Sequence, residues 1–121
     1  MRNWLMKSLA MVAALFMLAG GPFMSTASAG AKIALVLDVG GRGDLSFNDM
    51  GFKGTDEAQA NLGVEVVEIQ SNSAADYLPN MQNAARSGKF DLIVAVGFLL
   101  ADAMAEVADQ FPDQKFAIID V

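Results

Sequence analysis

The stretch at residues 38–48, DVGGRGDLSFN, combines groups that can bind a small molecule. Asp38 offers a carboxylate that can accept hydrogen bonds from a ligand hydroxyl or a ring N–H. Phe47 offers an aromatic face on which a flat ring can stack. Gly40 and Gly41 let the backbone take positive φ and let a ligand approach closely. These residues are compatible with binding of a small neutral molecule, but Asp38 can equally bond within the protein, and an isolated phenylalanine such as Phe47 is more often a core residue.

The same stretch predicts how the helix that follows it begins. Ser46 and Asp49 have the spacing of a capping box, in which the Ser46 hydroxyl accepts the Asp49 N–H and the Asp49 carboxylate accepts the Ser46 N–H. Leu45 and Met50 stand at the two positions of a hydrophobic staple. Asp44 is interpreted as a turn residue.

Catalysis and phosphate binding are disfavoured. The chain has no histidine and no cysteine, which removes the usual general base near neutral pH and the thiolate ligands of zinc and iron–sulfur sites. The glycine loop matches neither G-x-G-x-x-G nor a Walker loop, and Asp38 and Asp44 repel phosphate. A hydrolase using these two acids stays open, but no nucleophile–base relay or metal cage accompanies them. We therefore expect no enzyme activity, no catalytic residue, no cofactor and no metal.

The overall charge disfavours nucleic acid as a ligand. The formal net charge is −6 and the sequence pI is about 4.3. Binding to a nucleic-acid backbone needs clustered lysine and arginine. The chain is therefore not expected to bind nucleic acid.

These groups lie between alternating strand and helix patterns. Apolar runs predict strands over 32–37, 64–69, 90–96 and 115–119. Helical spacing falls over 47–62, 76–87 and 99–110, with Gly63, Gly88 and Pro112 as stop signals. This alternation predicts an α/β fold, a Rossmann-like parallel sheet with helices on both faces.

In such a sheet, ligands bind at the carboxyl ends of the strands. Asp38 follows the first predicted strand, Gly97 and Phe98 the third, and Asp120 the fourth. The second strand is followed by the polar loop 70–75. We expect these residues to form one crevice, with Gly97 and Phe98 lining it.

The first 29 residues have the three parts of a secretory signal peptide. Arg2 and Lys7 are followed by the apolar run at residues 8–18 and by the small-residue sequence Ala27-Ser28-Ala29. The apolar run is too short to span the roughly 30 Å of a bilayer core. We predict cleavage near Ala29-Gly30 and no lipid anchor, since a lipoprotein needs a cysteine at that point. Residues 30–121 are then the exported domain.

The stretches KIALVLDVGGRGDLSFNDMGFKG, DYLPNMQNAARSGKFDLIVAVGF and KFAIID resemble the basic membrane protein family. These PnrA-like proteins are the purine-nucleoside receptors of bacterial ABC importers. The resemblance implies a type I periplasmic binding protein, with ligand clamped between two Rossmann-like lobes. It implies that Asp38 hydrogen-bonds the base, that Phe47 stacks on one face of the base, and that Asp120 lies near the ligand. Gly40, Gly41 and Asn48 belong to the same signature and are counted as ligand-binding.

The resemblance also implies partners and a location. We expect a free periplasmic receptor that meets the membrane only through the permease subunits of its transporter. Residues 30–121 correspond to an incomplete N-terminal lobe, with the second lobe absent. We therefore expect weak nucleoside binding or none, and association through an unpaired edge strand. A receptor of the same fold for a flavin or a sugar-like signal, feeding a transporter or a sensor, is the alternative.

Overall fold

The computed structural model describes residues 30–121, and the predicted signal peptide lies outside this range. Its four strands are β1 (Lys32–Leu37), β2 (Glu65–Gln70), β3 (Leu92–Val96) and β4 (Phe116–Ile119). They form one sheet in the order β2-β1-β3-β4, and every neighbouring pair is parallel. The predicted parallel α/β fold is therefore confirmed.

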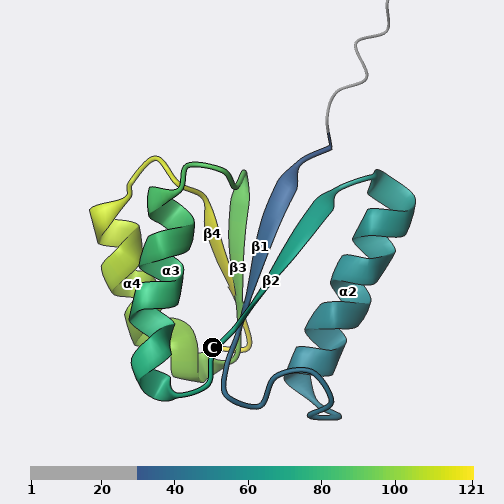
Figure 1. Cartoon of the computed structure of the whole chain (residues 1–121), viewed down its shortest axis with the longest axis horizontal. Coiled ribbons are helices and arrows are strands. Elements are labelled where there is room, and N and C mark those ends of the chain that lie inside the picture. The colour runs from purple at the N-terminus through teal and green to yellow at the C-terminus, as the bar shows by residue number, and fades with distance from the viewer. Residues whose placement is uncertain (1–29) are drawn as a thin grey trace, which may run out of the picture.

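The helices form a layer on each side of the sheet, α2 on one and α3 and α4 on the other (Figure 1). They are α2 (Phe47–Leu62), α3 (Tyr77–Arg86) and α4 (Ala101–Gln110). Short 3₁₀ turns, η1 (Ala74–Asp76) and η2 (Phe98–Leu100), precede α3 and α4. Within residues 30–121, no helix has the length and apolar character needed to cross a membrane.

The strands bury side chains on both faces, as the continuous apolar runs predict. Ala34 and Val36 of β1 belong to the core beneath α3 and α4. Leu35 and Leu37 alternate with them and pack with Phe52 of α2 in a smaller core on the other face. The period of two places every second residue of a strand on the same side, which explains how one short strand serves both layers.

The predicted element boundaries lie close to those of the structure. The first strand and the helix over 47–62 begin and end where predicted. Gly63 ends α2 with φ 66°, and its N–H donates to the Gln59 carbonyl at 3.2 Å. Each of the two later helices is preceded by a 3₁₀ turn that overlaps the start of the predicted helix, over residue 76 in the first and residues 99–100 in the second. The third strand begins at Leu92, slightly later than predicted.

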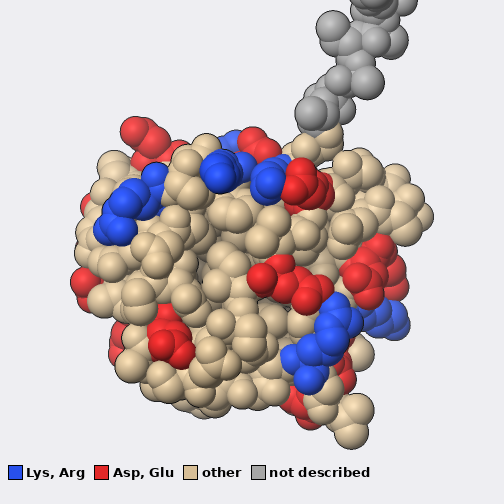
Figure 2. Space-filling view, in the orientation of Figure 1, with Lys and Arg blue, Asp and Glu red and all other residues tan. Residues whose placement is uncertain are grey.

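Charged side chains of both signs are interspersed on the surface. On the face drawn in Figure 2, basic side chains lie beside acidic ones and form no broad basic patch. Two exposed ion pairs involve the edge strand β2, namely Lys32 Nζ with Glu65 Oε1 and Arg42 Nη2 with Glu68 Oε1, each at 2.6 Å.

Candidate ligand-binding site

The carboxyl ends of the four strands lie side by side. The register pairs Leu37 with both Gln70 and Val96, and Val96 with Ile119. The loops that follow these residues therefore start at the same edge of the sheet. From the central pair β1 and β3, the chain leaves toward β2 on one side and toward β4 on the other. This is the topological switch point at which open α/β sheets bind ligands.

Asp38 lies at this switch point, and only one of its two carboxylate oxygens has hydrogen-bond partners in the described residues. Its Oδ1 accepts the Gly40 N–H at 2.8 Å and the Asn48 Nδ2–H at 2.7 Å. Its Oδ2 is directed toward Gly97, where a Cβ would come within 3.4 Å of it. Among residues 30–121, no hydrogen bond to Oδ2 is found. This oxygen can accept one hydrogen bond from a ligand.

Asn48 lies beneath Asp38 and is only 1% exposed. Its Nδ2 also donates to Asp44 Oδ2 at 2.9 Å, so one amide links two carboxylates. Its Oδ1 is buried and has no hydrogen-bond partner in the described part of the chain. Because the side chain is covered, its role in this geometry is to orient Asp38, and direct ligand contact by Asn48 is not supported by the burial.

Asp44, and not Ser46, caps helix α2. The Asp44 carboxylate accepts the N–H groups of Ser46, Asn48 and Asp49 at 2.8 to 3.1 Å. Burial raises the pKa of Asp44, but these hydrogen bonds and the one from the Asn48 side chain outweigh burial and hold the pKa below its ordinary value of 3.8. The predicted capping box at Ser46 is therefore wrong, since Ser46 makes no side-chain cap bond.

Asp49 also differs from its predicted role. Its carboxylate reaches past Ser46 to accept the N–H groups of Gly43 and Leu45, at 2.7 and 3.1 Å. Leu45 has φ 54° and is 92% exposed, and Met50 is 63% exposed. The predicted hydrophobic staple between them is therefore not formed, because the left-handed turn at Leu45 directs the loop away from the helix.

Two of the three glycines of the loop are needed for close packing. A Cβ on Gly40 would lie 3.0 Å from Asn48 Nδ2 and 3.1 Å from Asp38 Oδ1. Gly41 is buried with φ 61°, and a Cβ there would collide with the Gln70 side chain. The absence of a Cβ at both positions therefore lets the loop pack closely around Asp38.

Phe47 and Phe98 extend from the loops on either side of the switch point. Phe47 is the first residue of α2 and is 52% exposed, and Phe98 is the first residue of η2 and is 66% exposed. Gly97, with φ 98°, turns the chain between β3 and Phe98. Asp120 follows β4, is exposed and has φ 66°.

Large exposed apolar side chains gather around these loops. In the described residues, the large exposed apolar side chains lie at the end of β4 or in segments that follow β1, β3 or β4, with Leu62 as the exception. They are Val39, Leu45, Phe47, Met50, Phe98, Leu99, Ile119 and Val121. An exposed apolar group at one end of a domain indicates a binding surface.

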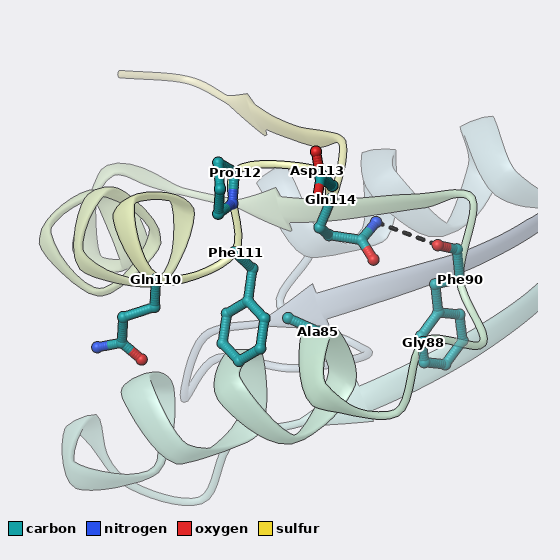
Figure 3. Close-up of a pocket in the computed structure, with 8 residues that line it drawn as sticks. All are labelled: Ala85, Gly88, Phe90, Gln110, Phe111, Pro112, Asp113 and Gln114. Carbon is teal, nitrogen blue, oxygen red and sulfur yellow. Dashed lines mark hydrogen bonds between the residues drawn. The ribbon is translucent and has the colours of Figure 1, made fainter.

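A pocket of about 450 Å³ lies at the opposite end of the sheet. It is bordered by the C-terminal ends of α3 and α4 and by the segments that lead into β3 and β4 (Figure 3). Its lining includes the rings of Phe90 and Phe111, and Gln114 Nε2 donates to the Phe90 carbonyl at 3.1 Å. The pocket contains none of the predicted site residues, so it is separate from the crevice at Asp38.

Sequence reasoning missed two residues that shape the site. Gln70 is predicted to lie in a loop, but it is the last residue of β2, and its Nε2 donates to the Asp38 carbonyl at 2.9 Å. Arg42 is not singled out, although it links the loop to β2 and α2. Both contacts follow from the register between β1 and β2, and no local sequence pattern predicts that register.

Comparison with known proteins agrees with the geometry. Residues 31–121 match the model of the Bmp family, described as ABC transporter substrate-binding proteins, PnrA-like. The chain belongs to this family. It is a family of substrate-binding proteins and not of enzymes, as the composition predicted.

Individual relatives match this chain over only part of their own length. An uncharacterized lipoprotein of Pyrococcus abyssi is 48% identical over 101 residues, which cover 84% of this chain and 25% of that protein. The ABC transporter nucleoside-binding protein BmpA of Lactococcus lactis is 36% identical over 93 residues, covering 74% of this chain and 26% of that protein. The chain thus spans about a quarter of the length of these relatives.

Comparison with a solved structure confirms the fold. An ABC transporter solute-binding protein of Aeropyrum pernix superposes with a TM-score of 0.72 at 47% identity, covering 75% of this chain and 25% of that protein. The described residues therefore form part of one lobe of a periplasmic-binding-protein fold. The Pyrococcus abyssi relative is described as a lipoprotein, whereas this chain contains no cysteine.

Proposed function

We propose that residues 38–48, 97–98 and 120 form one side of the binding site for an uncharged purine nucleoside in a periplasmic ABC receptor. The observation that carries this proposal is the open Oδ2 of Asp38 at the switch point. The exposed rings of Phe47 and Phe98 follow the same two strand ends. A purine base has a flat face for an aromatic ring and ring-edge N–H groups for a carboxylate.

The charges near the crevice favour a nucleoside over a nucleotide. Asp38, Asp44 and Asp120 follow the ends of β1 and β4, and all three are acidic. Arg42 is the basic residue of the first loop, and its guanidinium is already paired with Glu68 at 2.6 Å. A phosphate placed here would meet carboxylates and an arginine that is already paired. The ligand should therefore carry no phosphate.

The relatives support the same class of ligand and partner. The Lactococcus lactis relative is named as a nucleoside-binding protein of an ABC transporter. We infer that this protein delivers its ligand to the permease subunits of such a transporter. The predicted signal peptide and the absence of cysteine favour a free periplasmic receptor over a lipid-anchored one.

Nuclear magnetic resonance tests the proposal on this chain, because it detects weak binding residue by residue. Since the described residues contact only one side of the base, we expect a Kd on the order of 1 mM for inosine. The amide signals of Gly40, Phe47 and Gly97 should shift on titration. Asp38→Asn should weaken binding about tenfold or more, because a hydrogen bond to a charged acceptor is lost.

The controls separate binding in this crevice from binding elsewhere on the chain. Asp56→Asn removes the same charge from an exposed position on α2 and should leave the titration unchanged. Inosine monophosphate should bind more weakly than inosine. Riboflavin and a panel of sugars represent the alternative ligands, and a stronger response to either would replace the nucleoside in the proposal. Absence of any inosine-induced shift in residues 38–48 would refute it.

A further inference from the structure

The loop between β1 and α2 contains one non-glycine residue, Leu45, in the left-handed region. Gly41, Gly43 and Leu45 all have positive φ, at 61°, 91° and 54°. For leucine, this left-handed region costs on the order of 1 kcal/mol. Hydrogen bonds to Asp44 and Asp49 hold the helix end of this loop, and contacts from β2 and α2 hold its middle.

Arg42 supplies two such contacts from the middle of the loop. Its Nη2 donates to Glu68 Oε1 on β2 at 2.6 Å. Its Cζ lies 3.6 Å from the centroid of the Phe52 ring on α2. Phe52 is only 3% exposed and is part of the core. One guanidinium therefore ties the loop to both elements beside it.

Gln70 supplies a third contact from the same strand. Its Nε2 donates to the Asp38 carbonyl at 2.9 Å and to the Ser71 carbonyl at 2.7 Å. Gln70 stands two residues after Glu68, so both side chains leave the same face of β2. Val66, two residues before Glu68, packs in the core against α2, which identifies this as the α2 face. The edge strand thus holds the loop at Asp38 and at Arg42.

We propose that Arg42 is a positioning residue for the ligand site, acting through Glu68, Phe52 and the loop to fix the Asp38 carboxylate. The inference rests on the proposed function, because it assigns Arg42 a part in ligand affinity without ligand contact. Arginine suits this role because its planar guanidinium can bond a carboxylate and stack on a ring at once. Lysine keeps the charge but loses the planar stack.

The test compares Arg42→Gln, Arg42→Lys and the control Lys53→Gln in the purified chain. Lys53 is exposed on α2, and no ion pair to it is found in the described residues. The first readout needs no ligand: hydrogen exchange of the Gly40 amide, which donates to Asp38 Oδ1 at 2.8 Å. The second readout is the inosine titration, and the third is the Tm.

Arg42→Gln should speed Gly40 exchange and weaken inosine binding, each about three- to tenfold, because an exposed ion pair and a cation–π contact are both lost. Arg42→Lys should fall between Arg42→Gln and the wild type, and Lys53→Gln should match the wild type. The Glu68→Gln variant should weaken binding in the same way, and the double variant should add little to Arg42→Gln.

The outcomes separate this inference from the proposed function. Unchanged Gly40 exchange in Arg42→Gln would overturn the inference, whether or not inosine binds. Faster Gly40 exchange with unchanged inosine affinity would overturn it as well. If inosine does not bind the wild type, the proposed function fails, and Gly40 exchange alone then decides whether Arg42 fixes Asp38. A fall in Tm with unchanged Gly40 exchange would assign Arg42 a purely structural role and reject the proposal.

Discussion

Replacing Asn48 with aspartate should make the stability of this protein depend on pH. Asn48 is 1% exposed, and its Nδ2 lies 2.7 Å from Asp38 Oδ1 and 2.9 Å from Asp44 Oδ2. Asn48→Asp keeps the size of the side chain but places a third carboxyl group between two carboxylates. The substitution therefore tests whether this buried amide links the two acids.

The magnitude follows from two competing costs. Unit charges about 4 Å apart repel by about 4 kcal/mol at an effective dielectric constant of about 20, and the new carboxyl group, if ionised, would face two such neighbours. Protonating a carboxyl group with a reference pKa of about 3.9 costs about 4 kcal/mol at about pH 7. Protonation is the smaller cost, so the new group should stay neutral in the folded state with a raised pKa.

The sign of the pH effect follows from this raised pKa. Above the unfolded pKa of about 3.9, the unfolded state releases the proton and the folded state keeps it, so the variant loses stability as pH rises. Its free energy of unfolding relative to the wild type should fall by about 3 kcal/mol between about pH 4.5 and pH 7. In the wild type, the pKa of Asp44 lies below its ordinary value of 3.8, and the three backbone hydrogen bonds that contribute to this do not involve the substituted side chain.

Urea unfolding at about pH 4.5, 5.5 and 7 measures this difference. Asn48→Ala removes the same hydrogen bonds without adding a carboxyl group, and its loss of stability should be the same at each pH. Asn61→Asp adds the same group at an exposed position on α2 and should have little effect. A pH-independent difference between Asn48→Asp and the wild type would contradict the reasoning.

Three further predictions concern the loop, the helix cap and the sheet edge. Gly41→Ala should cost about 1 to 3 kcal/mol in chemical unfolding, because this position has a positive φ and a Cβ there meets the Gln70 side chain. An unchanged free energy of unfolding would argue against this packing. The folded pKa of Asp44 is depressed, so its contribution to stability is present above the ordinary value of 3.8 and is lost as pH falls through the lower folded pKa. Asp44→Asn should therefore lower the Tm at about pH 6 and make the Tm depend less on acid pH. An unchanged acid dependence of the Tm would argue against the helix cap. The edge strand β4 carries Ile119 at 48% exposure, so the chain should associate as its concentration rises, and the Ile119→Lys variant should associate less. Light scattering that finds a monomer at all concentrations would show this expectation to be wrong.

The sequence alone determined the elements and the region of the site. The strand over 32–37 and the helix over 47–62 follow from local hydrophobic periodicity and from the stop signal at Gly63. The alternation of strands and helices restricts the sheet to a parallel one, and parallel strands bring Asp38 and Gly97 to the same edge. These inferences succeed because they depend on neighbours in sequence and on chain handedness.

Only the tertiary structure decided which atoms meet at that edge. Ser46 and Asp44 are both good capping residues, and the left-handed turn at Leu45 lets Asp44 reach the helix N–H groups. The contact between Gln70 and Asp38 depends on β2 lying beside β1. Residues 32 positions apart meet there because of the strand register, and no local pattern encodes that register. The sequence therefore predicted the edge of the sheet that carries the proposed ligand site, and packing decided which oxygen of Asp38 has no hydrogen-bond partner in the described residues.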